Sequence, residues 1–209
     1  MRFELLRKKI SQYPLFTFTD ILKWFPEVNL STLKVDLNKW IKKGYLRKIK
    51  KGLFWFPEVE IPDQFYLAEK LLSPSYISLE TALNYYGIIP DVPQKVISLT
   101  PLTTRKFKTI FGDFWFCHIK KDYFFGFKSV YSDDKKFFYN IAVPEKALLD
   151  FIYFNLKRLK EIKDFSEERF CFDKFFSWKT CLKMAKVFQN KKVFEITKKI
   201  YQFYEKDKI

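Results

Sequence analysis

The sequence predicts an α+β fold, and three patterns along the chain lead to that prediction. Residues 16–56 combine two stretches of helical apolar spacing with the pattern of a short hairpin. Residues 95–142 change to short runs of β-branched and aromatic residues, which are typical of strands. Beyond Asp164 the spacing of amphipathic helices returns. With 48% apolar residues in 209, the chain can bury a core without disulfide or metal support.

The most informative segment is a predicted helix that begins at Ser31. Ser31 is expected to be its N-cap, and Gly44 is expected to end it. Because side chains three and four positions apart share a helix face, one face is expected to be buried and the other exposed. The buried face is formed by Leu33, Leu37, Trp40 and Ile41, and the exposed face by Ser31, Lys34, Val35, Asn38 and Lys42.

A shorter helix is predicted before this one. Thr19 is expected to cap the shorter helix, and Pro26 to end it, because the residue before a proline disfavours the helical conformation. Residues 27–30 then form a turn between the two helices. A turn of this length suits helices that cross at a steep angle.

A basic β-hairpin is predicted after the second helix. Residues 46–50 and 53–56 are its strands, and Gly52 between them permits the positive φ that a tight turn requires. Two helices, a tight turn and a hairpin form the layout of a winged helix-turn-helix, which we predict for residues 1–57. The cations of the hairpin, or wing, are Arg47, Lys48, Lys50 and Lys51.

Positive charge is concentrated at the two ends of the chain. Residues 1–57 hold thirteen Lys or Arg against four Asp or Glu, residues 58–156 hold eleven against twelve, and residues 157–209 hold fifteen against eight. This placement is expected if the first domain binds double-stranded DNA. Asn38 is the best candidate for reading adenine, because its amide donates and accepts together. The predicted DNA-binding residues are Ser31, Thr32, Lys34, Val35, Asn38, Lys39, Lys42, Arg47, Lys48, Lys50 and Lys51.

Several classes of protein do not fit the sequence. The start, MRFELLRKK, is charged where a signal peptide is apolar, and no run approaches about eighteen uncharged apolar residues, so we expect a cytoplasmic protein without a membrane partner. The chain has five glycines, and their spacing matches neither a phosphate-binding loop nor a dinucleotide-binding fingerprint. Asp133 and Asp134 are adjacent and are expected to lie in a turn. We therefore expect no catalytic residues, no cofactor and no enzymatic activity.

The cysteines and the single histidine do not predict a metal site. Cys117, Cys171 and Cys181 are odd in number, and no pair has metal-ligand spacing. We expect all three to be buried, reduced thiols. His118 lies in the strand-like run 113–119 and is expected to be a packed or hydrogen-bonded structural residue.

Residues 58–209 are predicted to form a second, α+β domain behind a polar, proline-containing connector. Helices are expected over 64–72 and from Ser78 to Gly87, and another begins at Pro144. The last part, from about residue 160, is basic and helical. Strands are expected over 95–100, 107–111, 113–119 and 136–142, with Gly112 at a turn. Two late amphipathic helices follow. The apolar face of the first is formed by Trp178, Cys181, Leu182, Ala185 and Phe188, and that of the second by Val193, Ile196, Ile200 and Phe203.

Three separated passages of the second domain resemble a known family. They are SPSYISLETALNYYGIIP at 73–90, SLTPLTTRKFKTIFGDFWFCHI at 98–119 and IAVPEKALLDFIY at 141–153. In this order, behind a winged helix-turn-helix, they resemble the AbiEi family of abortive-infection antitoxins. The resemblance covers nearly the whole chain to about residue 160, and the last helices match only in general character.

The resemblance implies an antitoxin and transcriptional autorepressor of a type IV toxin–antitoxin system that acts in phage defence. The N-terminal domain would bind operator repeats, as a monomer or a weak cooperative assembly. The C-terminal domain would counter a nucleotidyltransferase toxin, a functional partner that need not form a stable complex. Among the family motif residues, Glu145, Lys146 and Asp150 are also explained by a helix start and core. The candidate surface toward the toxin is Thr103, Thr104, Arg105 and Lys106, which we expect to lie together in a threonine-rich loop.

Two alternatives remain open at this point. The chain is also consistent with a stand-alone transcriptional regulator whose α+β domain senses a small molecule. The basic tail is consistent with RNA binding or with contact to a second DNA segment, although lysine-fringed amphipathic helices are ordinary surface structures. The lysine-rich wing suits attachment to the DNA backbone better than readout of guanine, for which arginine is better shaped.

Overall fold

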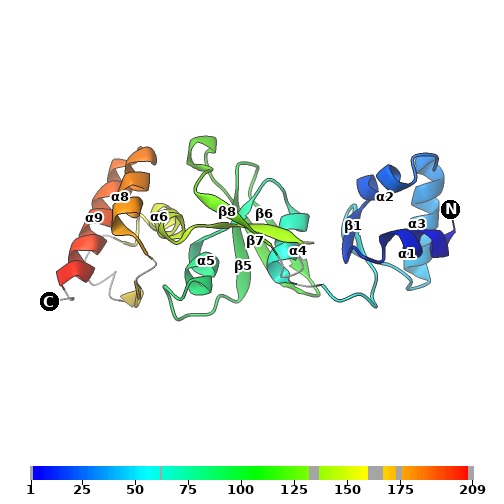
Figure 1. Ribbon diagram of the computed structural model, residues 1–209, viewed down its shortest axis with the longest axis horizontal. Helices are drawn as coiled ribbons and strands as arrows, with labels where there is room; N and C mark the ends of the chain where they lie inside the picture. The colour runs from blue at the N-terminus through cyan, green and yellow to red at the C-terminus, as the bar shows by residue number, and fades with distance from the viewer. Residues whose placement is uncertain (1, 62, 132–136, 160–166, 173–175, 207–209) are drawn as a thin grey trace.

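The computed structural model describes residues 2–61, 63–131, 137–159, 167–172 and 176–206, and its fold is mixed α+β, as predicted. Figure 1 shows an elongated molecule with a small first lobe, residues 2–56, at the right. A connector, residues 57–63, leads to a larger second lobe, residues 64–206, which ends in the C-terminal helices at the left. The aspartates predicted to form a turn, Asp133 and Asp134, lie outside the described residues, as does Lys136.

The first lobe consists of helices around a small antiparallel sheet. The sheet has the order β1-β3-β2, so the hairpin strands β2 and β3 are joined by a strand from before the helices. Neither α1 nor β1 was predicted. The strand β1 has only three residues, which are too few to show the alternation typical of a strand. In chain order the elements are α1 (Phe3–Ile10), β1 (Leu15–Thr17), α2 (Phe18–Trp24), α3 (Leu30–Lys42), β2 (Arg47–Lys50) and β3 (Leu53–Trp55).

The helix α2 begins earlier than predicted, and Thr19 is not its cap. Thr17 is the N-cap: its hydroxyl oxygen accepts from the backbone N–H of Asp20 at 3.2 Å, and the Asp20 carboxylate accepts from the Thr17 N–H at 2.8 Å. This reciprocal capping box needs an acid three residues after the cap, and only Thr17 has one. The end of the helix at Trp24, before Pro26, agrees with the prediction.

The second lobe is built on one six-stranded mixed sheet with the order β6-β7-β5-β4-β9-β8. The pairs β5–β7 and β4–β9 are parallel, and the other neighbours are antiparallel. Long connections therefore bring distant segments together, and β6 and β8 form the two edges. The strands are β4 (Tyr76–Ile77), β5 (Lys95–Thr100), β6 (Arg105–Thr109), β7 (Gly112–His118), β8 (Phe127–Tyr131) and β9 (Phe138–Ala142).

Helices pack against the sheet and extend the second lobe away from the first. In Figure 1 α4 lies on the side of the first lobe, whereas α6, α8 and α9 pack together at the far end. The predicted apolar faces of the last two helices are confirmed, with Cys181, Ala185, Val193 and Ile200 buried. None of the described helices is long and apolar enough to cross a membrane. The helices are α4 (Gln64–Leu71), α5 (Leu79–Tyr85), α6 (Pro144–Phe154), α8 (Trp178–Val187) and α9 (Lys191–Lys206), with a 3₁₀ turn η1 (Lys121–Tyr123).

Two predictions for the second lobe were wrong. Arg105 and Lys106 are not in a loop but begin β6, which starts two residues before the predicted strand and pairs with β7 from Arg105 to Thr109. The long-range partner strand decides this boundary, and local sequence does not show it. Cys171 was expected to be buried and is exposed, whereas Cys117 is half-buried and Cys181 is buried.

A buried ion pair joins α6 to β4 and α5. Lys146 and Asp150 have no exposed side-chain surface, and the Lys146 ammonium donates to the Asp150 carboxylate. The hydroxyls of Tyr76 and Ser78 donate to the same carboxylate at 3.0 Å and 2.8 Å. Ser78 stands at the N-cap of α5 as predicted, but its hydroxyl bonds Asp150 and not the helix. Burial lowers the pKa of Lys146 and raises the pKa of Asp150, and each partner's charge opposes the other's shift.

The backbone at Gly126 completes the enclosure of this pair. Gly126 has φ +73°, and a Cβ atom there would lie only 3.0 Å from Cγ of Lys146. A larger residue would meet both the positive φ and the lysine stem, which explains a glycine at this place. The rings of Phe125 and Phe188 also lie about the ammonium, each with its centroid 5.1 Å from Nζ. The pair is therefore shielded from water on several sides.

We expect Asp150→Ala to lower the free energy of unfolding by about 3–5 kcal/mol, because Lys146 then remains buried without its counter-ion. Urea denaturation followed by circular dichroism measures the change. The comparison is the double variant Lys146→Met/Asp150→Asn, which removes both charges and keeps an acceptor for the Tyr76 and Ser78 hydroxyls, and it is expected to lose less stability than Asp150→Ala. Equal stability of Asp150→Ala and the parent would contradict the role of the pair.

Candidate nucleic-acid interface

The helix α3 carries the predicted DNA-binding face, and its start differs from the prediction. Asn29 is the N-cap and Ser31 is not: the Asn29 Oδ1 atom accepts from the Ser31 N–H at 2.8 Å and from the Ser31 hydroxyl at 2.6 Å. Asn and Ser are both good caps, so the sequence offers two candidates two residues apart. Ser31 consequently lies in the first helical turn, with its hydroxyl hydrogen directed to Asn29.

The end of α3 is as predicted. Gly44 adopts φ +76° immediately after the last helical turn. Its N–H donates to the Ile41 carbonyl at 3.0 Å, and the Tyr45 N–H donates to the Trp40 carbonyl at 3.0 Å. This pair of bonds is the Schellman motif, which satisfies carbonyls that the helix leaves free. The chain then turns sharply enough to begin β2.

The two faces of α3 are separated as the spacing predicts. Leu33, Leu37 and Trp40 are buried in the first core, and Ile41 is half-buried beside them. Val35 is 66% exposed, an unusual placement for an apolar side chain. All seven predicted DNA-facing residues of the helix are exposed: Ser31, Thr32, Lys34, Val35, Asn38, Lys39 and Lys42.

The hairpin predicted as the wing consists of two paired strands, and Gly52 has φ +82° at its turn. Arg47, Lys48 and Lys51 are exposed. Lys50 differs, because it is half-buried and its ammonium donates to the carbonyl of Leu71 in the second lobe. Burial lowers the pKa of Lys50, and the nearby charge of Arg105 lowers it further. No local pattern predicts this contact, since Leu71 lies in another lobe.

A groove of about 310 Å³ separates α3 from the wing. Its apolar lining comes from Phe18, Leu37, Ile41 and Phe54. Among the described residues, those that line the groove include no acid, so the three ammonium groups give it a positive potential. The polar lining is formed by Lys34, Asn38, Lys48 and Lys51, two of them from the helix and two from the wing.

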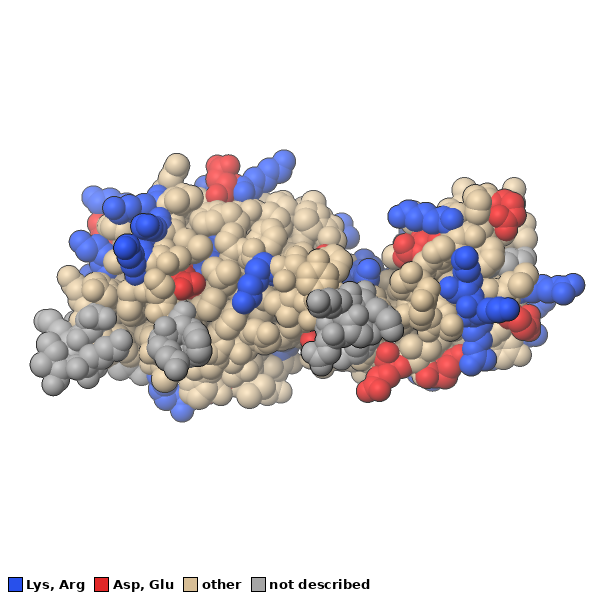
Figure 2. Space-filling model, in the orientation of Figure 1, with Lys and Arg blue, Asp and Glu red and all other residues tan. Residues whose placement is uncertain are grey.

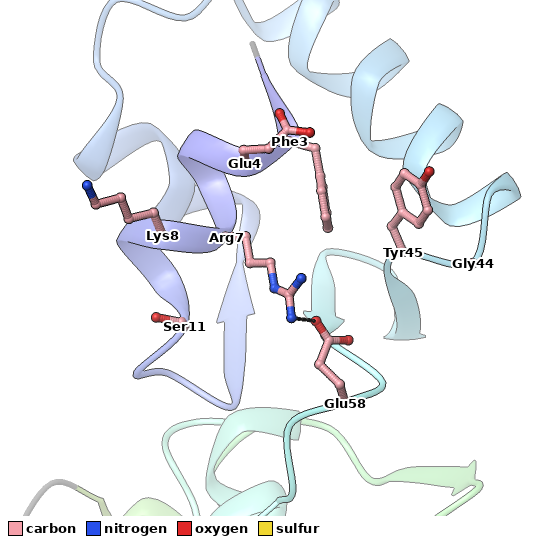
Figure 3. Close-up of a pocket in the computed structure, with 8 residues that line it drawn as sticks. All are labelled: Phe3, Glu4, Arg7, Lys8, Ser11, Gly44, Tyr45 and Glu58. Atoms are coloured by element: carbon pink, nitrogen blue, oxygen red, sulfur yellow. Dashed lines mark ion pairs between the residues drawn. The ribbon is translucent and has the colours of Figure 1, made fainter.

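A second, larger hollow of about 800 Å³ lies between α1, the end of α3 and the connector. Figure 3 shows Arg7 of α1 reaching Glu58 of the connector, and the two charges form an ion pair at 3.1 Å. Phe3 lies beside Tyr45 with ring centroids 5.0 Å apart. Two acids, Glu4 and Glu58, and two cations, Arg7 and Lys8, line this hollow, so it lacks the uniform charge of the groove. The ion pair fastens α1 to the connector.

The predicted toxin-facing residues lie at the edge of the six-stranded sheet. Thr103, Thr104, Arg105 and Lys106 are all exposed, the first two in the loop before β6 and the others within it. The Thr104 hydroxyl oxygen accepts from the His118 N–H at 3.0 Å. His118 is exposed, and its Nδ1 atom lies 2.8 Å from the Leu102 carbonyl, which is the expected hydrogen-bonded structural role. The predicted loop thus includes two strand residues.

Charge is unevenly spread over the molecule. Figure 2 shows Lys and Arg side chains on the first lobe and, at the other end, over the C-terminal helices, with few on the intervening surface of this face. The described residues contain no group of three or more His, Cys, Asp or Glu side chains arranged to hold a metal ion. Comparison of the chain with protein-family models and with curated protein sequences finds no match in either set.

Proposed function

We propose that the first lobe is a winged helix-turn-helix that binds double-stranded operator DNA, and that the protein is an antitoxin and autorepressor of a type IV toxin–antitoxin system. The observation that carries the DNA-binding part is the exposed polar face of α3 beside the basic wing, across an acid-free groove. The antitoxin part rests on the resemblance to the AbiEi family.

The exposed face of α3 has the chemistry to read bases. An α-helix fits into the major groove of B-DNA, where each base pair shows a distinct pattern of donors, acceptors and methyl groups. Asn38 offers an amide for adenine, and Val35 offers an apolar surface for a thymine methyl group. Both are exposed on the same face as Lys34, whose ammonium suits a phosphate. One helix therefore supplies base contacts and backbone contacts together.

The wing supplies backbone contacts beside the helix. Lys48 and Lys51 line the groove from the wing side, opposite Lys34 and Asn38 of α3. A DNA strand that follows this groove would have cations on both sides, and none of the described residues that line the groove is an acid. Ammonium groups are compact point charges that bind phosphates without reading sequence. The wing thus fixes the position of the duplex while α3 reads it.

We expect Asn38→Ala to weaken binding to the operator duplex by about 1–3 kcal/mol and to relax the preference at one base pair. Fluorescence anisotropy with the operator and with single-base variants of it measures both effects. Gln12→Ala, which truncates an exposed amide outside the proposed interface, is the matched control. An operator preference that survives Asn38→Ala unchanged would refute base readout by this residue.

Substitutions in the wing are expected to act differently. Lys48→Ala and Lys51→Ala should weaken binding to operator and unrelated DNA alike, because phosphate contacts carry no sequence information. Each lost contact should make the slope of log affinity against log salt shallower by about 0.9. Lys183→Ala, an exposed lysine of α8, serves as the control. If the salt slopes of both wing variants equal that of the parent, the wing does not contact phosphate.

The antitoxin part is tested by co-expression of the full chain with the neighbouring gene, from separate inducible promoters, while growth is followed. We expect the chain to restore growth if that gene encodes a nucleotidyltransferase toxin. The double variant Lys48→Ala/Lys51→Ala should restore growth equally well, because toxin counteraction is assigned to residues 58–209. If the parent chain does not rescue growth, the antitoxin part of the proposal fails and a stand-alone regulator remains.

A further inference from the structure

The first lobe is packed against the second, with its sheet turned toward it. Leu15, Leu53 and Trp55 belong to the small sheet, yet their side chains lie in the hydrophobic core of the second lobe. The Trp55 ring meets Phe111, in the turn between β6 and β7, edge to face at 5.0 Å between centroids. This contact sets the wing beside the β6 edge of the large sheet. The small sheet turns Lys48 toward the groove beside α3, and it turns Lys50, opposite Leu53, toward the second lobe and β6.

Lys50 lies at the boundary between these two charged segments. Its Nζ atom lies 5.5 Å from the centroid of Phe107, a residue of β6, in addition to the bond to Leu71. The charge of Arg105 is close enough to contribute to the lowered pKa of Lys50. Three cations follow one another here: Lys51 at the wing turn, Lys50 at the junction and Arg105 at the start of β6.

The edge strand β6 is itself strongly basic. Its sequence, RKFKT, holds no acid, and Arg105, Lys106 and Lys108 are exposed. Cross-strand register places Arg105 opposite Phe116 and Lys106 opposite Trp115, so the two cations project on opposite faces of the sheet. The Lys106 ammonium lies over the Trp115 ring of β7, 3.7 Å from its centroid, and the Lys106 side chain remains exposed on that face of the sheet. Asp113 lies opposite Lys108 and offsets part of its charge.

We infer that β6 extends the DNA-binding surface of the wing and contacts the backbone of the duplex next to the bases that α3 reads. This inference rests on the proposed function. Five residues of β6, at about 3.3 Å each, span roughly 16 Å, which corresponds to about five base pairs of B-DNA. The inference assigns Arg105 and Lys106 to DNA, whereas the resemblance had suggested a surface toward the toxin.

Two alternative roles for the charges of β6 lead to different outcomes. Lysines on an edge strand commonly prevent pairing with a second molecule, and in that case they need not touch DNA. The cations would instead serve toxin counteraction if β6 met the toxin or its substrate. In either role, removal of the β6 charges leaves DNA affinity unchanged.

The test compares the full chain with its triple variant Arg105→Ala/Lys106→Ala/Lys108→Ala on two operator duplexes. The long duplex extends about ten base pairs beyond the sequence read by α3, on the side of the wing. The short duplex ends where the sequence read by α3 ends. On the long duplex we expect the triple variant to bind on the order of tenfold more weakly, with a salt slope shallower by about 0.9 per lost phosphate contact. On the short duplex the parent and the triple variant should bind alike.

Two controls separate this effect from loss of folding or of net charge. Lys179→Ala/Lys183→Ala/Lys186→Ala removes three exposed cations of α8 and should leave both duplexes bound as by the parent. Arg105→Lys/Lys106→Arg/Lys108→Arg keeps the charges and should restore the parent's salt slope. A thermal melt of each variant shows whether the fold is kept.

The possible failures are distinguishable. If the parent chain binds neither duplex, the proposed function fails and this inference fails with it. If the parent binds both duplexes and the β6 triple variant matches its affinity and salt slope on the long one, this inference alone is overturned. Loss of growth rescue by the β6 variant without any change in DNA affinity would also overturn it, and would return the strand to the toxin surface.

Discussion

The burial of one stripe of α3 is the constraint on which the rest of the first lobe depends. Leu33, Leu37 and Trp40 are held in the first core, and this fixes the rotation of the helix about its axis. Once the rotation is fixed, every other side chain of the helix has a determined direction, and Asn38 and Val35 must face outward. The same core contains Phe54 from β3, so the wing is positioned by the packing that orients the helix.

The part of the fold that depends on local pattern was predictable, and the part that depends on distant partners was not. The faces of α3, its end at Gly44 and the hairpin turn at Gly52 follow from spacing and backbone freedom within a few residues. The strand β1 is defined by pairing of Phe16 with Phe54, and β6 by pairing of Arg105 with Phe116. For the candidate site, the outward residues of α3 were predicted from helical periodicity, whereas the contact of Lys50 with Leu71 joins two lobes and leaves no local signature.

The contact between the lobes bears on how the cations of the wing are presented to a ligand. Trp55 and Leu53 pack into the second core, so the wing is supported on that face by the larger lobe. A wing supported in this way loses less conformational entropy on meeting a ligand than a free hairpin would. The position of the cations therefore matters more than their number, because a rigid arrangement of a few charges presents a defined shape to a regular polyanion.

The enclosed Lys146 and Asp150 pair has a consequence for how this sequence can diverge. Three stretches of chain meet there: Tyr76 and Ser78 before and at the start of α5, Gly126 before β8, and the pair itself on α6. Replacing either charged residue leaves the other buried without its counter-ion. A sequence that loses one of the two charges is therefore expected to lose the other as well. Homologous chains should consequently keep the lysine and the aspartate together or replace both together, and the glycine should be kept wherever the lysine stem is kept.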